Sequence, residues 1–366
     1  MSDLRDRLGR AFEFAAGQVK ATVERTPDYA PCYTRDGRWK HGGHARADWS
    51  SGLLAGMMWR IAERTGSSRW RACAEDYSRR LEPKKQDRAL HDLGFVFLPT
   101  YLPWFRADGD PIVNDVLVTA GRSLAQRYNA RGQFLRSWVA PASTRIDLMM
   151  SVPLVLHAAI ETGDELLYDL AVSHCRTAER TLVRPDGGTA EEAVFDLDTG
   201  DFLGNATPVG FGTETVWARG QAWAISGFLS AYLYTNDPAD LAVAERCADY
   251  YLARCPDGEI PPWDFDVPPG PARLDDTSAA AIAASGLLDL ATLTADAARA
   301  GRYRDAARAT LDTLCTDRYM AWSVPDWEGV VRHGVYRFHE RRGIDESLIW
   351  GDYYFLEAVD KALHAA

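Results

Sequence analysis

The sequence predicts an all-α protein of the (α/α)6 barrel type, in which an outer ring of helices encloses an inner ring. Apolar residues recur at helical spacing in about twelve stretches. Almost no stretch shows the alternation that is typical of strands. Amphipathic and uncharged stretches alternate roughly six times along the chain, as two concentric rings require.

The amphipathic stretches are predicted to form the outer ring, because each has one polar face. Charged neighbours flank the periodic apolar residues of 167–182 and 303–314. Another helix is expected near 238–253, where Asp237 can act as N-cap and Pro238 occupies the first helical position.

The uncharged stretches are predicted to form the inner ring, buried on most sides. They cover residues 93–105, 148–160, 220–236 and 277–288. In such a barrel the inner helices run in one direction, so their N-terminal ends open onto a single mouth. Free N–H groups and helix dipoles make this mouth favourable for an anionic ligand.

Composition and charge exclude several classes of protein. The chain has 366 residues, of which 46% are hydrophobic and 25% charged, which argues against a disordered or fibrous protein. The net charge of -11 without a basic run argues against nucleic acid or an anionic membrane surface as partner. No internal repeat or linker is evident, so residues 1–366 are expected to form a single domain.

The sequence also shows no motif for cofactor binding and no targeting segment. The six cysteines are scattered without a CxxC pair or a histidine at zinc-ligand spacing, so reduced core thiols are expected: Cys32, Cys73, Cys175, Cys247, Cys255 and Cys315. No nucleotide or metal cofactor is indicated. A charged N-terminus and the lack of a long apolar segment predict a cytoplasmic protein that does not enter membranes.

Polar and aromatic residues gather at the predicted starts of the inner helices. These clusters cover residues 48–52, 91–95, 145–147, 217–223, 275–278 and 347–352, and Asp48 belongs to the first of them. Trp49, Trp138, Trp217 and Trp223 near this mouth are suited to stacking on sugar rings, which indicates a carbohydrate site.

Structural roles compete with this interpretation. Asp92, Asp147 and Asp275 could cap helices, and Trp59 and Trp263 are assigned to the core. Arg219 lies in an otherwise uncharged helix, where an unpaired buried guanidinium is costly and the carboxylate of a ligand would satisfy it. His91 is expected to orient Asp92 or a substrate hydroxyl, with a purely structural role as the alternative.

Five ordered motifs together resemble the unsaturated glucuronyl hydrolases, glycoside hydrolase family 88. They are HDLGF at 91–95, IDLMM at 146–150, WARGQAW at 217–223, DTSAAAIA at 276–283 and SLIWGDYYF at 347–355. The resemblance extends from about Trp49 to Ala358 and implies an (α/α)6 barrel. It implies hydration-initiated cleavage of a Δ4,5-unsaturated uronic acid at the non-reducing end of a lyase-generated oligosaccharide or related glycoside.

The resemblance also implies a role for each site residue. Asp147 is the implied general acid and base, which gives a proton to C4 and then helps a water molecule add at C5, so that the unstable hemiketal expels the aglycone. Asp92 is expected to bind ring hydroxyls and to keep Asp147 protonated by like-charge repulsion. The implied substrate-binding residues are His91, Trp49, Trp138, Arg219, Trp223 and Tyr336.

Three positions depart from the family pattern. Val209 stands where the family has glutamine, Glu191 and Glu192 where it often has histidine, and Ser151 where asparagine is usual. With the catalytic pair retained, these departures predict a change in the aglycone or modified uronate that is accepted.

Two other functions are compatible with the same barrel. One is a different carbohydrate enzyme, an inverting glycosidase or a sugar epimerase, which would act on a saturated substrate. The other is a sugar-binding or helical interaction module without catalysis, which would bind sugar and be indifferent to Asp147→Asn. Two carboxylates at one mouth favour an enzyme over a binding module.

Overall fold

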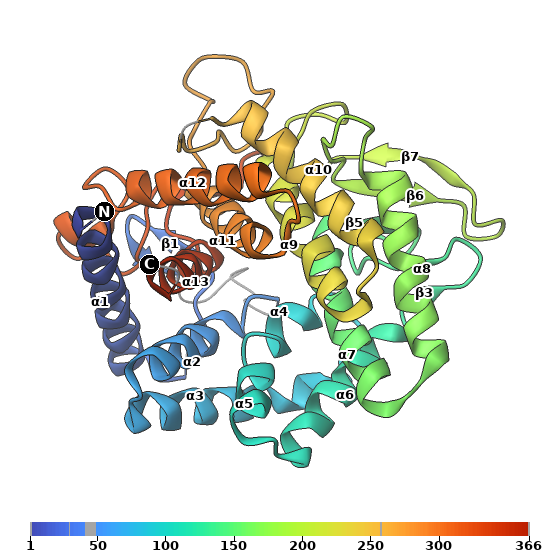
Figure 1. Cartoon of the computed structure of the whole chain (residues 1–366), viewed down its shortest axis with the longest axis horizontal. Helices are drawn as coiled ribbons and strands as arrows, with labels where there is room; N and C mark the ends of the chain where they lie inside the picture. Colours follow the sequence, from blue (N-terminus) through green and yellow to red (C-terminus); the bar gives the residue numbers. More distant parts are fainter. Residues whose placement is uncertain (1, 29, 41–48, 257, 365–366) are drawn as a thin grey trace.

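Two concentric rings of helices form the protein, as the alternating sequence pattern predicts (Figure 1). The computed structural model describes residues 2–28, 30–40, 49–256 and 258–364. One hydrophobic cluster extends from Leu8 in the first helix to Leu363 in the last, and a small second cluster is formed by Trp263, Val267 and Val335. Trp59 and Trp263 are 2% and 1% exposed, which confirms the prediction that both belong to the core.

The inner ring consists of helices that are buried on most sides, and three of them, over residues 152–162, 218–235 and 277–293, carry a single charged residue each. Almost every residue of the last inner helix is buried, for example. In chain order the inner helices are α2 (Leu53–Thr65), α4 (Leu93–Phe97) with α5 (Tyr101–Asp108), α7 (Val152–Thr162), α9 (Ala218–Thr235), α11 (Thr277–Leu293) and α13 (Ile349–His364).

The outer ring consists of amphipathic helices that turn one face to the inner ring. Several begin at an aspartate whose side chain caps the helix: Asp237 Oδ1, for instance, accepts the Ala239 N–H at 2.9 Å, as the Asp-Pro signal predicts. The outer helices are α1 (Ser2–Arg25), α3 (Ser68–Leu81), α6 (Pro111–Ala125), α8 (Glu165–Leu182), α10 (Pro238–Arg254) and α12 (Ala297–Leu314).

The expected helix over 93–105 is not continuous, which corrects the sequence prediction. It is interrupted between α4 and α5, because Pro99 has no N–H to give to the Phe95 carbonyl. The Thr100 hydroxyl bonds to the Val96 carbonyl at 2.6 Å instead. The stretch at 148–160 also begins differently, with the 3-10 helix η2 (Ile146–Met150) before α7. Two further 3-10 turns are η1 (Glu82–Gln86) and η3 (Ala321–Ser323).

Short antiparallel strands occupy the connections between helices, although the sequence predicts almost no strands. The longest have five residues, too few to leave a clear alternation. The pairs are β1 (Thr34–Arg35) with β2 (Arg38–Trp39), β3 (Tyr128–Asn129) with β4 (Phe134–Leu135), and β8 (Gly334–Arg337) with β9 (Arg342–Glu346). A three-stranded sheet has the order β5 (Ser143–Arg145), β6 (Glu192–Phe195) and β7 (Phe202–Ala206).

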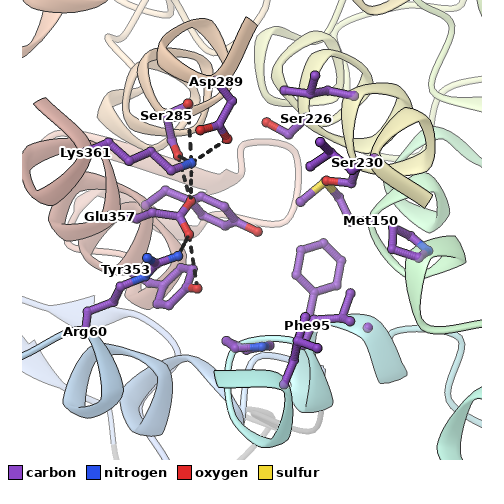
Figure 2. Close-up of a pocket in the computed structure, with 18 of the residues that line it drawn as sticks. Arg60, Phe95, Met150, Ser226, Ser230, Ser285, Asp289, Tyr353, Glu357 and Lys361 are labelled. Carbon is purple, nitrogen blue, oxygen red and sulfur yellow. Dashed lines mark hydrogen bonds and ion pairs between the residues drawn. The ribbon is translucent and has the colours of Figure 1, made fainter. Parts of the chain in front are cut away.

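The inner helices leave a hollow at each end of the barrel, and Phe95 lines both. The hollow at their C-terminal halves has an empty volume of about 1530 Å³. Figure 2 shows its charged side, where Lys361 Nζ contacts Asp289 Oδ2 at 2.6 Å, Ser285 Oγ at 2.8 Å and Glu357 Oε2 at 3.3 Å. These charges pair with one another, so this end is built around a closed ion network. None of the described helices has the length and hydropathy that crossing a bilayer requires.

Candidate active site

A pocket at the N-terminal ends of the inner helices brings together every residue that the sequence analysis assigned to the site. Its empty volume is about 480 Å³. The predicted residues that line it are Asp147, Asp92, His91, Trp49, Trp138, Arg219, Trp223 and Tyr336, and the others among the described residues are Phe95, Arg145, Val209, Trp217 and Arg337. Asp48, which the sequence places beside this group, lies outside the described residues.

Asp92 is held by two neighbours and does not cap its helix. It occupies the N-cap position of α4 but makes no side-chain capping bond. Its Oδ1 lies 3.1 Å from His91 Nε2, and its Oδ2 accepts the Trp138 Nε1–H at 3.1 Å. The Trp138 backbone N–H donates to His91 Nδ1 at 3.0 Å, which places the imidazole proton on Nε2, facing Asp92. His91 Nε2 thus lies against Asp92, the arrangement that an orienting role requires.

The carboxylate of Asp147 has fewer close polar neighbours than that of Asp92. It lies inside η2, after the N-cap residue Arg145, so it does not cap that turn. Its Oδ1 is buried and finds no hydrogen-bond partner among the described residues. The nearest cationic or imidazole atoms are His91 Nε2, 3.9 Å from Oδ1, and Arg145 Nε, 3.8 Å from Oδ2. Both distances exceed a hydrogen bond, so Asp147 keeps bonding capacity toward the pocket.

Arg145 and Glu191 form a buried ion pair beside Asp147, and neither was assigned a role in the site from sequence. They are 4% and 3% exposed, and Arg145 Nη2 donates to Glu191 Oε1. Burial by itself lowers the pKa of the Arg145 guanidinium, but the carboxylates of Asp147 and Glu191 raise it above its usual range. Burial raises the pKa of the Glu191 carboxyl, although Arg145 and two backbone N–H groups oppose this. The sequence carried one indication that Arg145 belongs to the site, because it is a charged residue two positions before Asp147.

Arg219 is already neutralised by the protein, which corrects the expectation of an unpaired guanidinium awaiting a ligand. Its Nη1 contacts Asp276 Oδ2 at 3.2 Å and donates to the Val335 carbonyl at 2.6 Å, and its Nη2 donates to the Tyr336 carbonyl at 2.8 Å. Burial lowers the pKa of Arg219, and Asp276 acts against that shift. The guanidinium also lies over the Trp217 ring, 4.5 Å from its centroid. Arg219 thus fixes the wall of the pocket.

The capping role considered for Asp275 belongs to its neighbour. Asp276 is the N-cap of α11 and accepts the Ser278 N–H at 3.1 Å, so one carboxylate serves both the helix and Arg219. Asp275 instead accepts from Arg318 Nη2 and the Tyr319 hydroxyl, each at 2.8 Å. The alternative of a capping aspartate was therefore wrong for Asp92, Asp147 and Asp275.

Aromatic side chains make up much of the lining of the pocket. Trp223 is buried and its ring centroid lies 5.0 Å from that of Phe95, while Trp49 packs against Trp350 at 4.7 Å. Trp49 Nε1–H donates to the Tyr336 hydroxyl at 3.3 Å. Trp138 is 50% exposed, so part of its ring is open to solvent. Flat, partly accessible rings beside carboxylates suit a sugar ring.

The residues that depart from the family pattern lie at different positions relative to the pocket. Val209 lines the pocket with an apolar side chain. Glu191 accepts the Val209 N–H at 2.8 Å, so two of the departures are in direct contact. Ser151 is buried and is not among the residues that line the pocket; its Oγ accepts the Gly94 N–H at 3.2 Å. A Cβ at Gly94 would come within 2.4 Å of the Ser151 Cα, so only glycine permits this close approach.

The six thiols and the metal-ligating side chains add nothing to this pocket. Every cysteine is free and Cys73 alone is half-buried, the others being buried. Within the described ranges, no three or more His, Cys, Asp or Glu side chains are grouped so as to hold a metal ion.

Comparison with known proteins identifies the relatives of this architecture. A model of the family described as Glycosyl Hydrolase Family 88 matches residues 20–319. An unsaturated glucuronyl hydrolase of Formosa agariphila is 33% identical over 322 residues, which cover 86% of this chain and 80% of that protein. The crystal structure of an unsaturated glucuronyl hydrolase specific for heparin has a TM-score of 0.90 at 29% identity and covers 98% of both chains. A mutant of the Streptococcus agalactiae enzyme, complexed with dGlcA-GalNAc6S, has a TM-score of 0.83 at 27% identity, with 98% of this chain and 91% of that chain covered.

Proposed function

Because the chain belongs to glycoside hydrolase family 88 and is an unsaturated glucuronyl hydrolase, we propose that Asp147 is the group that carries its reaction. The substrate is an unsaturated uronyl oligosaccharide or a related glycoside. Asp147 gives its proton to C4 of the C4=C5 double bond, and a water molecule then adds at C5. The anomeric carbon is not attacked, so the separation of the carboxylates does not determine the stereochemistry as it does in ordinary glycosidases.

The reaction balances with one water molecule. The proton from Asp147 forms the C4–H bond, and the positive charge that develops at C5 is shared with the ring oxygen. Water oxygen forms the C5–O bond and its proton returns to Asp147. The product is a hemiketal, whose ring opens between C5 and the ring oxygen, and C1 then releases the aglycone as an alcohol and becomes an aldehyde.

The observation that carries this assignment is the contrast between the two carboxylates. Asp92 Oδ2 accepts the Trp138 Nε1–H and its Oδ1 lies 3.1 Å from His91 Nε2, whereas the buried Oδ1 of Asp147 has no hydrogen-bond partner among the described residues. His91 Nε2 lies between them, 3.1 Å from Asp92 and 3.9 Å from Asp147. Asp147 therefore has an oxygen free to act on the substrate, whereas Asp92 is held in place by its neighbours. Asp147 is the acid, and Asp92 is the group that binds ring hydroxyls.

The aromatic residues define where the sugar lies. Trp223 and Trp49 offer ring faces and edges deep in the pocket, so the unsaturated uronyl ring packs there. Trp138 at the mouth then meets the first sugar of the aglycone. The apolar side chain of Val209 removes a polar contact from this pocket and so shifts the choice of aglycone or of modified uronate.

A spectrophotometric assay tests the assignment directly. The absorbance of the conjugated C4=C5 carboxylate is followed while the purified protein acts on lyase-generated unsaturated disaccharides. Asp147→Asn is expected to lower kcat by about 10³-fold, because the general acid is lost while the shape is kept. Asp240→Asn serves as a matched control. Asp240 is a buried aspartate of α10 that pairs with Arg176, and it is far from Asp147 along the chain. An Asp147→Asn enzyme with the wild-type rate would overturn the assignment.

The free thiols also bear on the cellular location. Six cysteines without a disulfide suit a reducing compartment, and we place the protein in the cytoplasm on this ground. Fractionation of cells followed by immunodetection tests this, and enrichment outside the cytoplasmic fraction would contradict it.

A further inference from the structure

We propose that Arg145 binds and orients the water molecule that attacks C5, and that Glu191 fixes the guanidinium for this task. The inference rests on the proposed function, in which Asp147 takes a proton from that water. The Arg145–Glu191 ion pair has no other part in the reaction.

The position of Arg145 is set by the backbone around it. It is the last residue of β5 and lies opposite Glu192 of β6 in an antiparallel register. The next residue, Ile146, donates its N–H to the Glu191 carbonyl at 3.0 Å. Asp147 follows one residue later, so a single rigid segment carries both the arginine and the proposed acid.

Glu191 holds the guanidinium at one end only. Its carboxylate accepts from Arg145 Nη2, from the Val209 N–H at 2.8 Å and from the Gly210 N–H at 2.9 Å. With three donors and 3% exposure, this carboxylate has no freedom to swing into the pocket. It also neutralises the charge of Arg145, so the guanidinium does not act as an open trap for a carboxylate.

The other edge of the guanidinium has an unused donor. Arg145 is 4% exposed, and its Nε finds no hydrogen-bond partner among the described residues. This atom faces Asp147 Oδ2 at 3.8 Å, too far for a direct hydrogen bond. Two atoms at that separation can both reach one oxygen placed about 2.8 Å from each. Both residues line the pocket, and the oxygen of the proposed water lies between Arg145 Nε and Asp147 Oδ2.

The chemistry of the two flanking groups selects water for that site. The occupant must accept the Arg145 Nε–H and must donate a proton to the carboxylate that Asp147 becomes after protonating C4. Water does both, whereas an oxygen of the substrate carboxylate has no proton to give and would face a second negative charge.

The step is complete in protons and electrons. A water lone pair forms the C5–O bond and neutralises the positive charge at C5. One water proton passes to Asp147 Oδ2 and restores the acid that gave its proton to C4. Arg145 keeps all its protons throughout and contributes the hydrogen bond that holds the oxygen in line.

Steady-state kinetics with guanidinium rescue test the inference. Arg145→Gln and Arg145→Ala are expected to lower kcat by about 10²-fold, with KM within about twofold of wild type, because positioning of the nucleophile is lost and sugar contacts remain. Added guanidinium ion is expected to restore part of the kcat of Arg145→Ala, while the same concentration of sodium chloride does not. Arg145→Gln combined with Glu191→Gln is expected to be no slower than Arg145→Gln alone, since the two residues act as a unit.

A control separates this role from support of the fold. Arg60→Gln breaks a comparable arginine–glutamate pair at the opposite end of the barrel, with Glu357, and should leave kcat unchanged. A raised KM with an unchanged kcat in Arg145→Gln would overturn the inference and assign the arginine to the substrate carboxylate. A lowered kcat without guanidinium rescue would overturn it in favour of a structural role. Failure of wild type to consume the double bond would instead refute the proposed function itself.

Discussion

Acid is expected to weaken the protein through Glu357, at the end of the barrel opposite the candidate active site. Glu357 is 8% exposed and contacts Arg60 Nη2, Ser285 Oγ at 2.6 Å and Lys361 Nζ at 3.3 Å (Figure 2). Burial raises the pKa of this carboxyl, but Lys361 and Arg60 outweigh burial and lower it from 4.5 to about 2.

The size of the effect follows from that shift. Because the pKa is lower in the folded state, the stabilisation is complete above the unfolded pKa and is lost as the pH falls through the folded one. Lowering the pKa of Glu357 from 4.5 to about 2 corresponds to about 3 kcal/mol, a large part of the total stability of an ordinary protein. About 2 kcal/mol of it should be lost between about pH 6 and about pH 3.

Urea unfolding followed by tryptophan fluorescence measures this loss when wild type is compared with Glu357→Gln. The glutamine keeps an acceptor for the Ser285 hydroxyl but has no charge and does not titrate. Near neutral pH the variant should be less stable by about 3–5 kcal/mol, since Arg60 loses its buried partner. Between about pH 6 and about pH 3, wild type should lose about 2 kcal/mol more than the variant. Equal losses in the two proteins would refute the argument.

Three further outcomes are expected. Trp138→Phe keeps a ring at the mouth but removes the Nε1–H that Asp92 accepts at 3.1 Å, so kcat/KM should fall by about tenfold or more in steady-state kinetics; an unchanged kcat/KM would show that this bond does not matter for turnover. Asp276→Asn leaves Arg219 buried without its counter-charge and should lower the unfolding free energy by about 3–5 kcal/mol in urea titrations, whereas a surface-like loss below about 0.5 kcal/mol would contradict the pairing. Thiol titration of the native protein should modify only Cys73, and all six thiols should react after unfolding; rapid reaction of a second native thiol would show that the core opens.

The ring architecture could be predicted from local patterns, because the apolar and charged residues within each helix show how much of its surface must be buried. A stretch without charges, such as the one that became α11, has no face that tolerates water, so it must be enclosed. Asp237 and Pro238 start α10 through contacts confined to adjacent residues. The interruption at Pro99 and the short hairpins left weaker signals, because a strand of two to five residues offers too few alternations to be distinguished from a loop.

Sequence alone also determined which residues meet at the mouth, since inner helices that all run one way bring their N-terminal residues to one end. It did not determine how those residues pair. Arg219 finds Asp276 57 positions away, and Arg145 finds Glu191 46 positions away. Each pair forms only when the barrel closes and buried charges must find partners in space. The sequence thus determined the rings and eight of the residues that line the pocket, whereas the tertiary structure decided which charges are neutralised and which atoms of Arg145 and Asp147 have no hydrogen-bond partner among the described residues.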